Sequence, residues 1–148
     1  MDMQTTQPIK SLKDIRKLKQ YYLDRHQIRN YALVTLGMNT SLRISDLLLL
    51  KWENVYNFCN KCYFHHIDIL EQKTGKTTKI ALNKEVLQAL KQLKKTLPHL
   101  SSDDYLFQSR EGRNRPISRT QAFRIIKKAA DELHIEGIIS CHSLRKTF

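Results

Sequence analysis

The stretch Thr40-Ser-Leu-Arg-Ile-Ser-Asp-Leu-Leu-Leu-Leu-Lys-Trp-Glu-Asn-Val55 decides how the rest of the chain is arranged. Its run from Leu47 to Leu50 is apolar on every side, which predicts a short helix packed into the core. Ser45 is placed to cap the start of that helix. Arg43 lies just before the helix, and Asp46 follows three residues later, where its carboxylate can orient the guanidinium group. Taken alone, such a pair is most often a structural ion pair, so its meaning depends on the rest of the chain.

The composition is that of a folded, strongly basic protein. With 148 residues, 41% of them apolar, the chain fits one domain, residues 1–148, around one core. Its 26 Lys and Arg against 14 Asp and Glu give a net charge of +12, which favours a nucleic acid as partner. No apolar run reaches membrane-spanning length, and the N-terminus lacks the apolar core of a signal peptide. We therefore expect a cytoplasmic protein with reduced cysteines and no membrane partner.

Hydrophobic periodicity predicts helices at both ends and strands between them. The first helix follows Ser11, and a second runs from Ile28 to Leu36 and ends at Gly37. Segments 55–58, 63–70 and 77–82 are rich in β-formers, with turns at Asn60-Lys61 and at 73–76. Short connections between consecutive strands predict an antiparallel meander. The fold class is thus mostly α with a small three-stranded antiparallel sheet (α+β).

Two further helices have clear start signals in the second half of the chain. Asn83 is the predicted cap of a helix whose buried face holds Val86, Leu90, Leu93 and Leu97. Ser118 and Gln121 make a capping box for the next helix. The predicted buried stripe of that helix is Phe123, Ile126, Ala130 and Leu133.

The chain ends in a second arginine motif, His142-Ser-Leu-Arg-Lys-Thr-Phe148. Together with the first stretch it resembles the tyrosine recombinase (phage integrase) family. The usual first motif of that family is Thr-Gly-Leu-Arg-Ile-Ser/Gly-Glu-Leu, so here Ser41 replaces a glycine and Asp46 a glutamate. The second motif resembles His-x-Leu-Arg-His-Thr-Phe, with Lys146 in place of a histidine. Two such matches in the right order are a strong joint signal.

The resemblance implies a role for each motif residue. Arg43 and Arg145 would form a clamp for the phosphate, supported by Asp46, because arginine forks donate charge-assisted hydrogen bonds and keep their charge. The family places a catalytic lysine in a β-hairpin turn, which fits Lys73 better than Lys76; either could instead be a solvated turn residue. His142 would accept or share the proton of the attacking hydroxyl. No metal or cofactor is implied.

The same resemblance implies DNA breakage and rejoining through a 3′-phosphotyrosyl intermediate, carried out by a homotetramer on double-stranded DNA. The family supplies its tyrosine after the second arginine motif, whereas all six tyrosines here precede His142. We therefore expect a catalytic-domain fragment whose C-terminal part is missing. Such a fragment is expected to be monomeric and to bind DNA without cleaving it.

Basic residues near the last predicted helix suggest where DNA would lie. The candidates for phosphate contacts are Arg110, Arg113, Arg115, Arg119 and Lys76. A solvated helix face beside a flexible loop has the same composition. The alternative function is accordingly a basic DNA-binding module without catalysis.

A zinc site is the competing interpretation of the middle segment. Cys59 and Cys62 have ligand spacing, and His65 and His66 follow them. No second cysteine pair follows, and Cys141 is remote in sequence. We therefore expect no metal site here.

Overall fold

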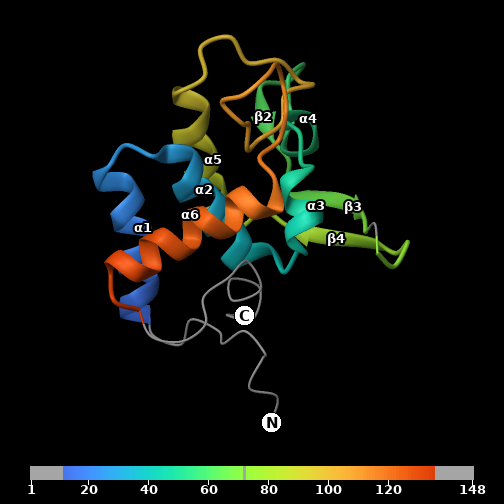
Figure 1. Cartoon of the computed structure of the whole chain (residues 1–148). Helices are drawn as coiled ribbons and strands as arrows, with labels where there is room; N and C mark the ends of the chain where they lie inside the picture. The colour runs from blue at the N-terminus through green and yellow to red at the C-terminus, as the bar shows by residue number, and fades with distance from the viewer. Residues whose placement is uncertain (1–11, 72, 136–148) are drawn as a thin grey trace.

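The computed structural model describes residues 12–135 apart from residue 72, and its helices enclose one core (Figure 1). In chain order the elements are α1 (Leu12–Asp24), α2 (Ile28–Thr40), α3 (Ile44–Leu48), α4 (Trp52–Val55), β1 (Tyr56–Asn57), β2 (Cys62–Tyr63), β3 (His66–Leu70), β4 (Thr77–Ala81), α5 (Lys84–Lys95) and α6 (Arg119–Glu132). The predicted class, mostly α with small antiparallel strands, is confirmed. In Figure 1, α6 crosses the front of the molecule, and the β3–β4 hairpin extends to one side.

Helix α2 forms the centre of the core because its middle, residues 31–38, is almost entirely apolar. Residues 30–38 are all buried, and α2 packs against α1, α3 and α5. Helix α5 is amphipathic: Val86, Ala89, Leu90 and Leu93 are buried, while most of its lysines face solvent. Burying one leucine such as Leu90 contributes about 1.5–3 kcal/mol.

The predicted end of α2 at Leu36 is wrong, since the helix continues through Gly37 to Thr40. Three polar side chains near its end bond to carbonyl oxygens four residues earlier: Thr35 to Tyr31 (2.8 Å), Asn39 to Thr35 (2.8 Å) and Thr40 to Leu36 (2.7 Å). These bonds let polar residues remain inside a largely buried helix. The helix stops at Ser41, whose φ of 58° is in the left-handed region that glycine adopts most easily.

The predicted three-stranded meander is also wrong in detail, because the structure has two separate hairpins. Strands β1 and β2 pair only through Tyr56↔Tyr63 and Asn57↔Cys62, whereas β3 and β4 pair along their whole length, from His66↔Ala81 to Leu70↔Thr77. Between β2 and β3 the backbone groups do not continue either ladder but bond to residues outside the paired strands. The N–H of Phe64 donates to the Val55 carbonyl (3.0 Å), and the His65 carbonyl accepts from the N–H of Leu82 (2.9 Å). The chain therefore bends there instead of continuing as one strand.

Both caps predicted in the second half of the chain are confirmed. The Asn83 side chain accepts from the N–H of Val86 at 2.9 Å. Ser118 and Gln121 bond reciprocally at 3.1 Å, as a capping box requires. Such caps form from residues three positions apart, so local sequence is enough to predict them.

Other local predictions, of one helix cap and of which side chains are buried, are wrong. Arg43, not Ser45, is the N-cap of α3, because the Arg43 carbonyl accepts the first helical bond from Leu47 at 2.9 Å. Leu49 is 42% exposed, unlike its neighbours in the leucine run. On α6 the buried residues are Ala122, Ile126, Ala129 and Ala130, while Phe123 is 40% exposed.

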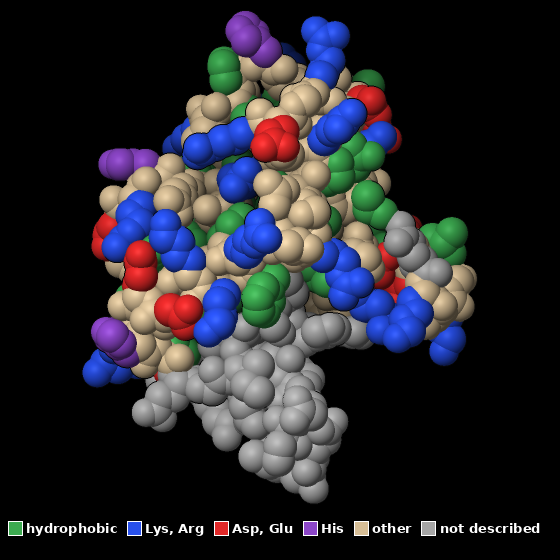
Figure 2. All heavy atoms as spheres, in the orientation of Figure 1, with side chains coloured by type: hydrophobic (Ala, Val, Ile, Leu, Met, Phe, Trp, Pro, Cys, Tyr) green, Lys and Arg blue, Asp and Glu red, His purple; other side chains and the backbone are tan. Residues whose placement is uncertain are grey.

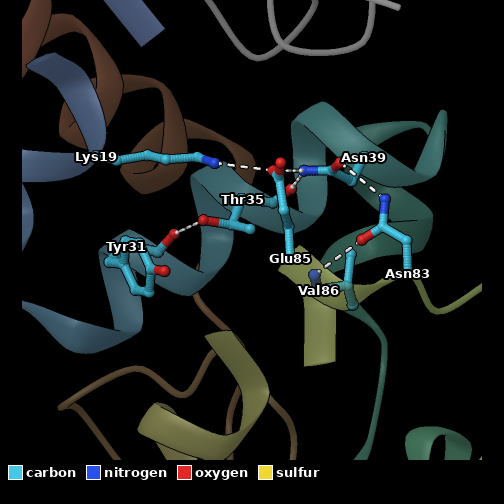
Figure 3. Close-up of polar contacts among 7 residues, drawn as sticks. All are labelled: Lys19, Tyr31, Thr35, Asn39, Asn83, Glu85 and Val86. Atoms are coloured by element: carbon cyan, nitrogen blue, oxygen red, sulfur yellow. Dashed lines mark hydrogen bonds and ion pairs between the residues drawn. The ribbon is translucent and has the colours of Figure 1, made fainter. Parts of the chain in front are cut away.

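A polar network joins α1, α2 and α5 (Figure 3). Lys19 of α1 forms an ion pair with Glu85 at 3.1 Å, and the Asn39 amide group donates to the same carboxylate at 3.4 Å. Asn83 donates to the Asn39 side chain at 2.9 Å while capping α5. The network therefore fixes the start of α5 against the two N-terminal helices.

The hydrogen bond from Lys19 is the main reason why the pKa of Glu85 lies below its ordinary value. Folding therefore gains stability from this group above its unfolded pKa, and the gain is lost as pH falls through the lowered folded pKa. Replacing Lys19 by Met should raise the pKa of Glu85, which an NMR titration of its carboxyl carbon would measure. Because the Glu85 side chain is 61% exposed, the loss of stability should stay within about 0.5 kcal/mol. Lys17→Met is the matched control, and an equal shift there would contradict the assignment.

Candidate functional site

Arg43 lies at the junction of α2 and α3, in the segment that sequence reasoning singled out. Its side chain is half-buried, and its Nε is buried with no hydrogen-bond partner among residues 12–71 and 73–135. A buried donor without a partner costs about 1–3 kcal/mol, so this N–H is available to an anion. Asp46 is 4% exposed and lies on the first turn of α3. Because α3 packs against both α2 and α6, the position of Arg43 is set by the core.

Lys73 and Lys76 both lie exposed in the turn between β3 and β4. Backbone bonds close this turn: Gly75 N–H donates to the Glu71 carbonyl (2.9 Å), and Glu71 N–H donates to the Lys76 carbonyl (2.8 Å). Gly75 has a φ of 70°, which explains a glycine at the tip. The turn thus presents two lysines, three positions apart, to solvent, and the choice of Lys73 over Lys76 stays a prediction.

His142 and Arg145 lie outside the described residues, so their convergence with Arg43 stays a prediction. The last described helix before them, α6, is tied to α1 near its C-terminal end. The Tyr21 hydroxyl donates to Glu132, Arg25 pairs with the same carboxylate at 3.8 Å, and the Tyr22 hydroxyl donates to the Ile125 carbonyl at 3.1 Å. These contacts hold α6 against α1.

The predicted DNA-contacting arginines, Arg110, Arg113, Arg115 and Arg119, are all exposed. The first three lie in a loop closed by a bond from Ser109 N–H to the Arg115 carbonyl (2.6 Å), and Arg119 begins α6. Figure 2 shows Lys and Arg side chains along α6 and over the β3–β4 hairpin. In the described part of the chain, no helix is both long and apolar enough to cross a membrane.

The two cysteines of the first hairpin and the two histidines that follow it do not gather into a metal site within the described residues. Cys59 and Cys62 are both exposed free thiols, and His65 and His66 are exposed as well. Across residues 12–71 and 73–135, no three His, Cys, Asp or Glu side chains lie close enough together to hold a metal ion.

Three of the tyrosines are held in their protonated form. Burial raises the pKa of Tyr63 to about 12, with a smaller contribution from Tyr56. Burial also raises the pKa of Tyr31, and for Tyr21 burial acts together with Glu132. A nucleophilic hydroxyl is helped by a lowered pKa or a neighbouring base, so burial makes Tyr31 and Tyr63 poorly suited to attack a phosphate.

Sequence reasoning missed Arg29, which the fold places at the start of α2. Its Nε and Nη2 donate to the Asn30 side chain at 3.1 and 3.0 Å, and its Nη1 donates to the Gln108 carbonyl at 2.9 Å. Arg29 therefore fastens the 106–110 loop to α2. The signal in the sequence was a charged residue directly before the long buried run of α2, because a charged side chain drawn into a core needs a partner.

Comparison with known proteins agrees with these features. The model of the phage integrase family matches residues 9–148. The chain is 40% identical, over 147 residues, to the probable integrase/recombinase YoeC of Bacillus subtilis (strain 168), covering 99% of this chain and 74% of that protein. A crystal structure of XerA recombinase superposes with a TM-score of 0.73 at 25% identity, covering 97% of this chain and 50% of that one.

A structure of lambda integrase bound to DNA shares the fold, with a TM-score of 0.72 at 17% identity over 99% of this chain and 51% of that chain. The chain thus spans about half the length of the two solved structures. With a family match over residues 9–148 and a 40% identical relative, this chain belongs to the phage integrase family.

Proposed function

We propose that this chain supplies the phosphate-activating part of a site-specific DNA recombinase or integrase, which cuts and rejoins duplex DNA through a 3′-phosphotyrosyl link. The observation that carries the proposal is Arg43, a half-buried arginine whose buried Nε has no partner in the part of the chain that the structure describes. It caps the short helix whose first turn carries the buried Asp46. Family membership and the charge of +12 support it. A protein that acts on DNA in this way is proposed to be located in the cytoplasm.

The proposed clamp consists of Arg43 and Arg145. A phosphodiester in its transition state spreads negative charge over the non-bridging oxygens, and two fixed guanidinium groups would stabilise that charge. Asp46, buried on the first turn of α3, would help to hold the Arg43 side chain in one orientation. His142 would take or share the proton of the attacking tyrosine hydroxyl.

Lys73 is the proposed general acid, which protonates the leaving 5′ oxygen. Its place in a backbone-closed but exposed turn supports this role, because the hairpin can present the ammonium group to a duplex. Lys76 would then contact a neighbouring phosphate. If Lys76 were the acid instead, replacing it would affect cleavage more strongly than replacing Lys73.

Double-stranded DNA is the proposed partner, held by the exposed Arg110, Arg113, Arg115 and Arg119. Such phosphate contacts position a duplex without reading its sequence. XerA and lambda integrase, the latter solved on DNA, share this fold. A homotetramer across two duplexes is the proposed assembly of the longer protein, whereas the 148 residues alone are proposed to be monomeric.

The test is formation of a covalent protein–DNA adduct. The 148 residues contain six tyrosines, all before His142, so we expect no adduct from them on a denaturing gel even with a cognate duplex. A protein that adds the family's downstream tyrosine segment should form one. An adduct from the 148 residues that one Tyr→Phe change abolishes would show that the nucleophile is among the six.

A non-catalytic DNA-binding module remains the second candidate, favoured by the same exposed arginines. Under this alternative the longer protein would bind DNA as tightly but form no adduct. The adduct assay therefore separates the two functions.

Salt should weaken DNA binding steeply. With four arginine–phosphate contacts, the slope of log K against log salt should be about −4, because each contact releases counterions. Fluorescence anisotropy with a labelled duplex would measure it, and Arg113→Gln should reduce the slope by about one. Affinity that does not change with salt would contradict the proposed interface.

A further inference from the structure

Two adjoining cavities at the start of α2 form a basic site that contains none of the proposed catalytic residues and shares only Arg110 with the proposed DNA interface. Their volumes are about 310 and 390 Å³. The residues that line both are Gln27, Arg29, Asn30, Ser109 and Arg110. The first cavity continues to Leu93 of α5 and to Leu97 just after it, and the second continues to α6.

The charges around these cavities are mostly positive. Arg29 and Arg110 are joined in the second cavity by Lys128 of α6, and Glu111 is the acidic group of its lining. Within the part of the chain that the structure describes, none of these four side chains takes part in an ion pair. The cavities therefore hold a local excess of positive charge.

Arg29 has donors left for a ligand. Its three hydrogen bonds go to neutral acceptors, the Asn30 amide oxygen and the Gln108 carbonyl. A guanidinium group has five N–H donors, so two have no partner among residues 12–71 and 73–135. Burial, and next the nearby Arg110, lower the pKa of Arg29. An anion in the cavity would compensate both effects.

The start of α2 adds to the same preference. Its N-cap, Gln27, makes no side-chain capping bond, and the first turn contains no acidic residue. The positive end of the helix dipole is thus not offset locally. This feature strengthens the field of the arginines at the place where the cavities meet.

We propose that these cavities form a binding site for a single phosphate group, separate from the Arg43 site. At a rise of about 1.5 Å per residue, the 13 residues of α2 separate its two ends by roughly 20 Å. Arg29 and Arg110 hold the phosphate oxygens through charge-assisted bonds, while Lys128 contributes a point charge. The phosphate belongs either to a DNA backbone or to a small phosphorylated molecule.

Titration of the 148-residue chain with inorganic phosphate tests the site. We expect saturable amide shifts in ¹H–¹⁵N NMR spectra at Arg29, Asn30 and Arg110. Arg110→Gln should raise the dissociation constant about tenfold, since a hydrogen bond to a charged group is worth about 1.5–3 kcal/mol and 1.4 kcal/mol is tenfold. Arg16→Gln, the same change at an exposed site on α1, is the control and should leave phosphate binding unchanged.

Lys128→Gln keeps the test valid if Arg110→Gln impairs folding, and it should weaken phosphate binding several-fold. Absence of saturable shifts at the cavity, or equal weakening by Arg16→Gln, would overturn the proposal. A failed adduct assay would leave it intact, because phosphate binding here needs no strand cleavage.

A competition experiment identifies the source of the phosphate. If a DNA backbone supplies it, inorganic phosphate should compete with a labelled duplex, and Arg110→Gln should weaken duplex binding more than Arg113→Gln. If a small molecule supplies it, the two variants should weaken duplex binding equally, while Arg110→Gln alone loses phosphate binding. Either result supports the site and assigns its ligand.

Discussion

Replacing Arg43 by alanine is expected to slow the formation of the protein–DNA adduct by about 10²–10³-fold in the protein that carries the downstream tyrosine. The loss of one preorganised donor to a developing anion has this size, and Arg43 has a buried N–H with no partner in the described structure. Single-turnover adduct formation on a cognate duplex would measure the rate.

The same change should have little effect on folding. Because the buried Nε lacks a partner within residues 12–71 and 73–135, its removal takes away an unsatisfied polar group. The midpoint of thermal unfolding should therefore stay near that of the unaltered chain. Arg43→Lys keeps the charge but loses the fork, so its rate should lie between the two.

Arg16→Ala on α1 is the control for the loss of a positive charge, and we expect adduct formation at nearly the original rate. A less than tenfold effect of Arg43→Ala, with the fold intact, would argue against its role in the clamp. Unfolding of Arg43→Ala would show instead that this arginine is structural.

Replacing Trp52 by alanine should remove about 3–5 kcal/mol of stability, the range found when a large buried aromatic residue is truncated. Trp52 is fully buried at the start of α4, and its backbone N–H donates to the Asp104 carbonyl at 2.9 Å. The free energy of unfolding of a whole domain is about 5–15 kcal/mol, so much of the stability would be lost. Urea unfolding followed by circular dichroism would measure the difference.

Trp52→Phe separates packing from polarity at the same position. The indole Nε1 is buried with no hydrogen-bond partner among the described residues, so phenylalanine removes an unsatisfied donor while leaving a smaller cavity. We expect a cost below about 1.5 kcal/mol. Leu49→Ala, at a 42% exposed position in the neighbouring leucine run, should cost less than Trp52→Ala. Equal losses for Trp52→Ala and Leu49→Ala would contradict the described core.

Predictions from sequence succeeded where the deciding interactions are local. The caps at Asn83 and Ser118 were found because a cap and its N–H lie within one helical turn. The α5 stripe was found because Val86, Leu90 and Leu93 recur at helical spacing. The family was recognised through two short motifs, and the family match over residues 9–148 confirms it; the role of Arg43 within its motif stays a prediction.

By itself, the sequence determined the helical class, the basic character and the family of this protein. The tertiary structure alone decided three further points: α2 continues to Thr40, the strands form two hairpins, and Arg29 connects α2 to the 106–110 loop beside a basic cavity. The Arg29 bond joins groups 79 positions apart in sequence, and residues far apart likewise meet at the bend between the hairpins. Hydrogen-bond partners that lie far apart in the chain, and the burial they share, depend on packing of the whole core, which neither periodicity nor propensity encodes.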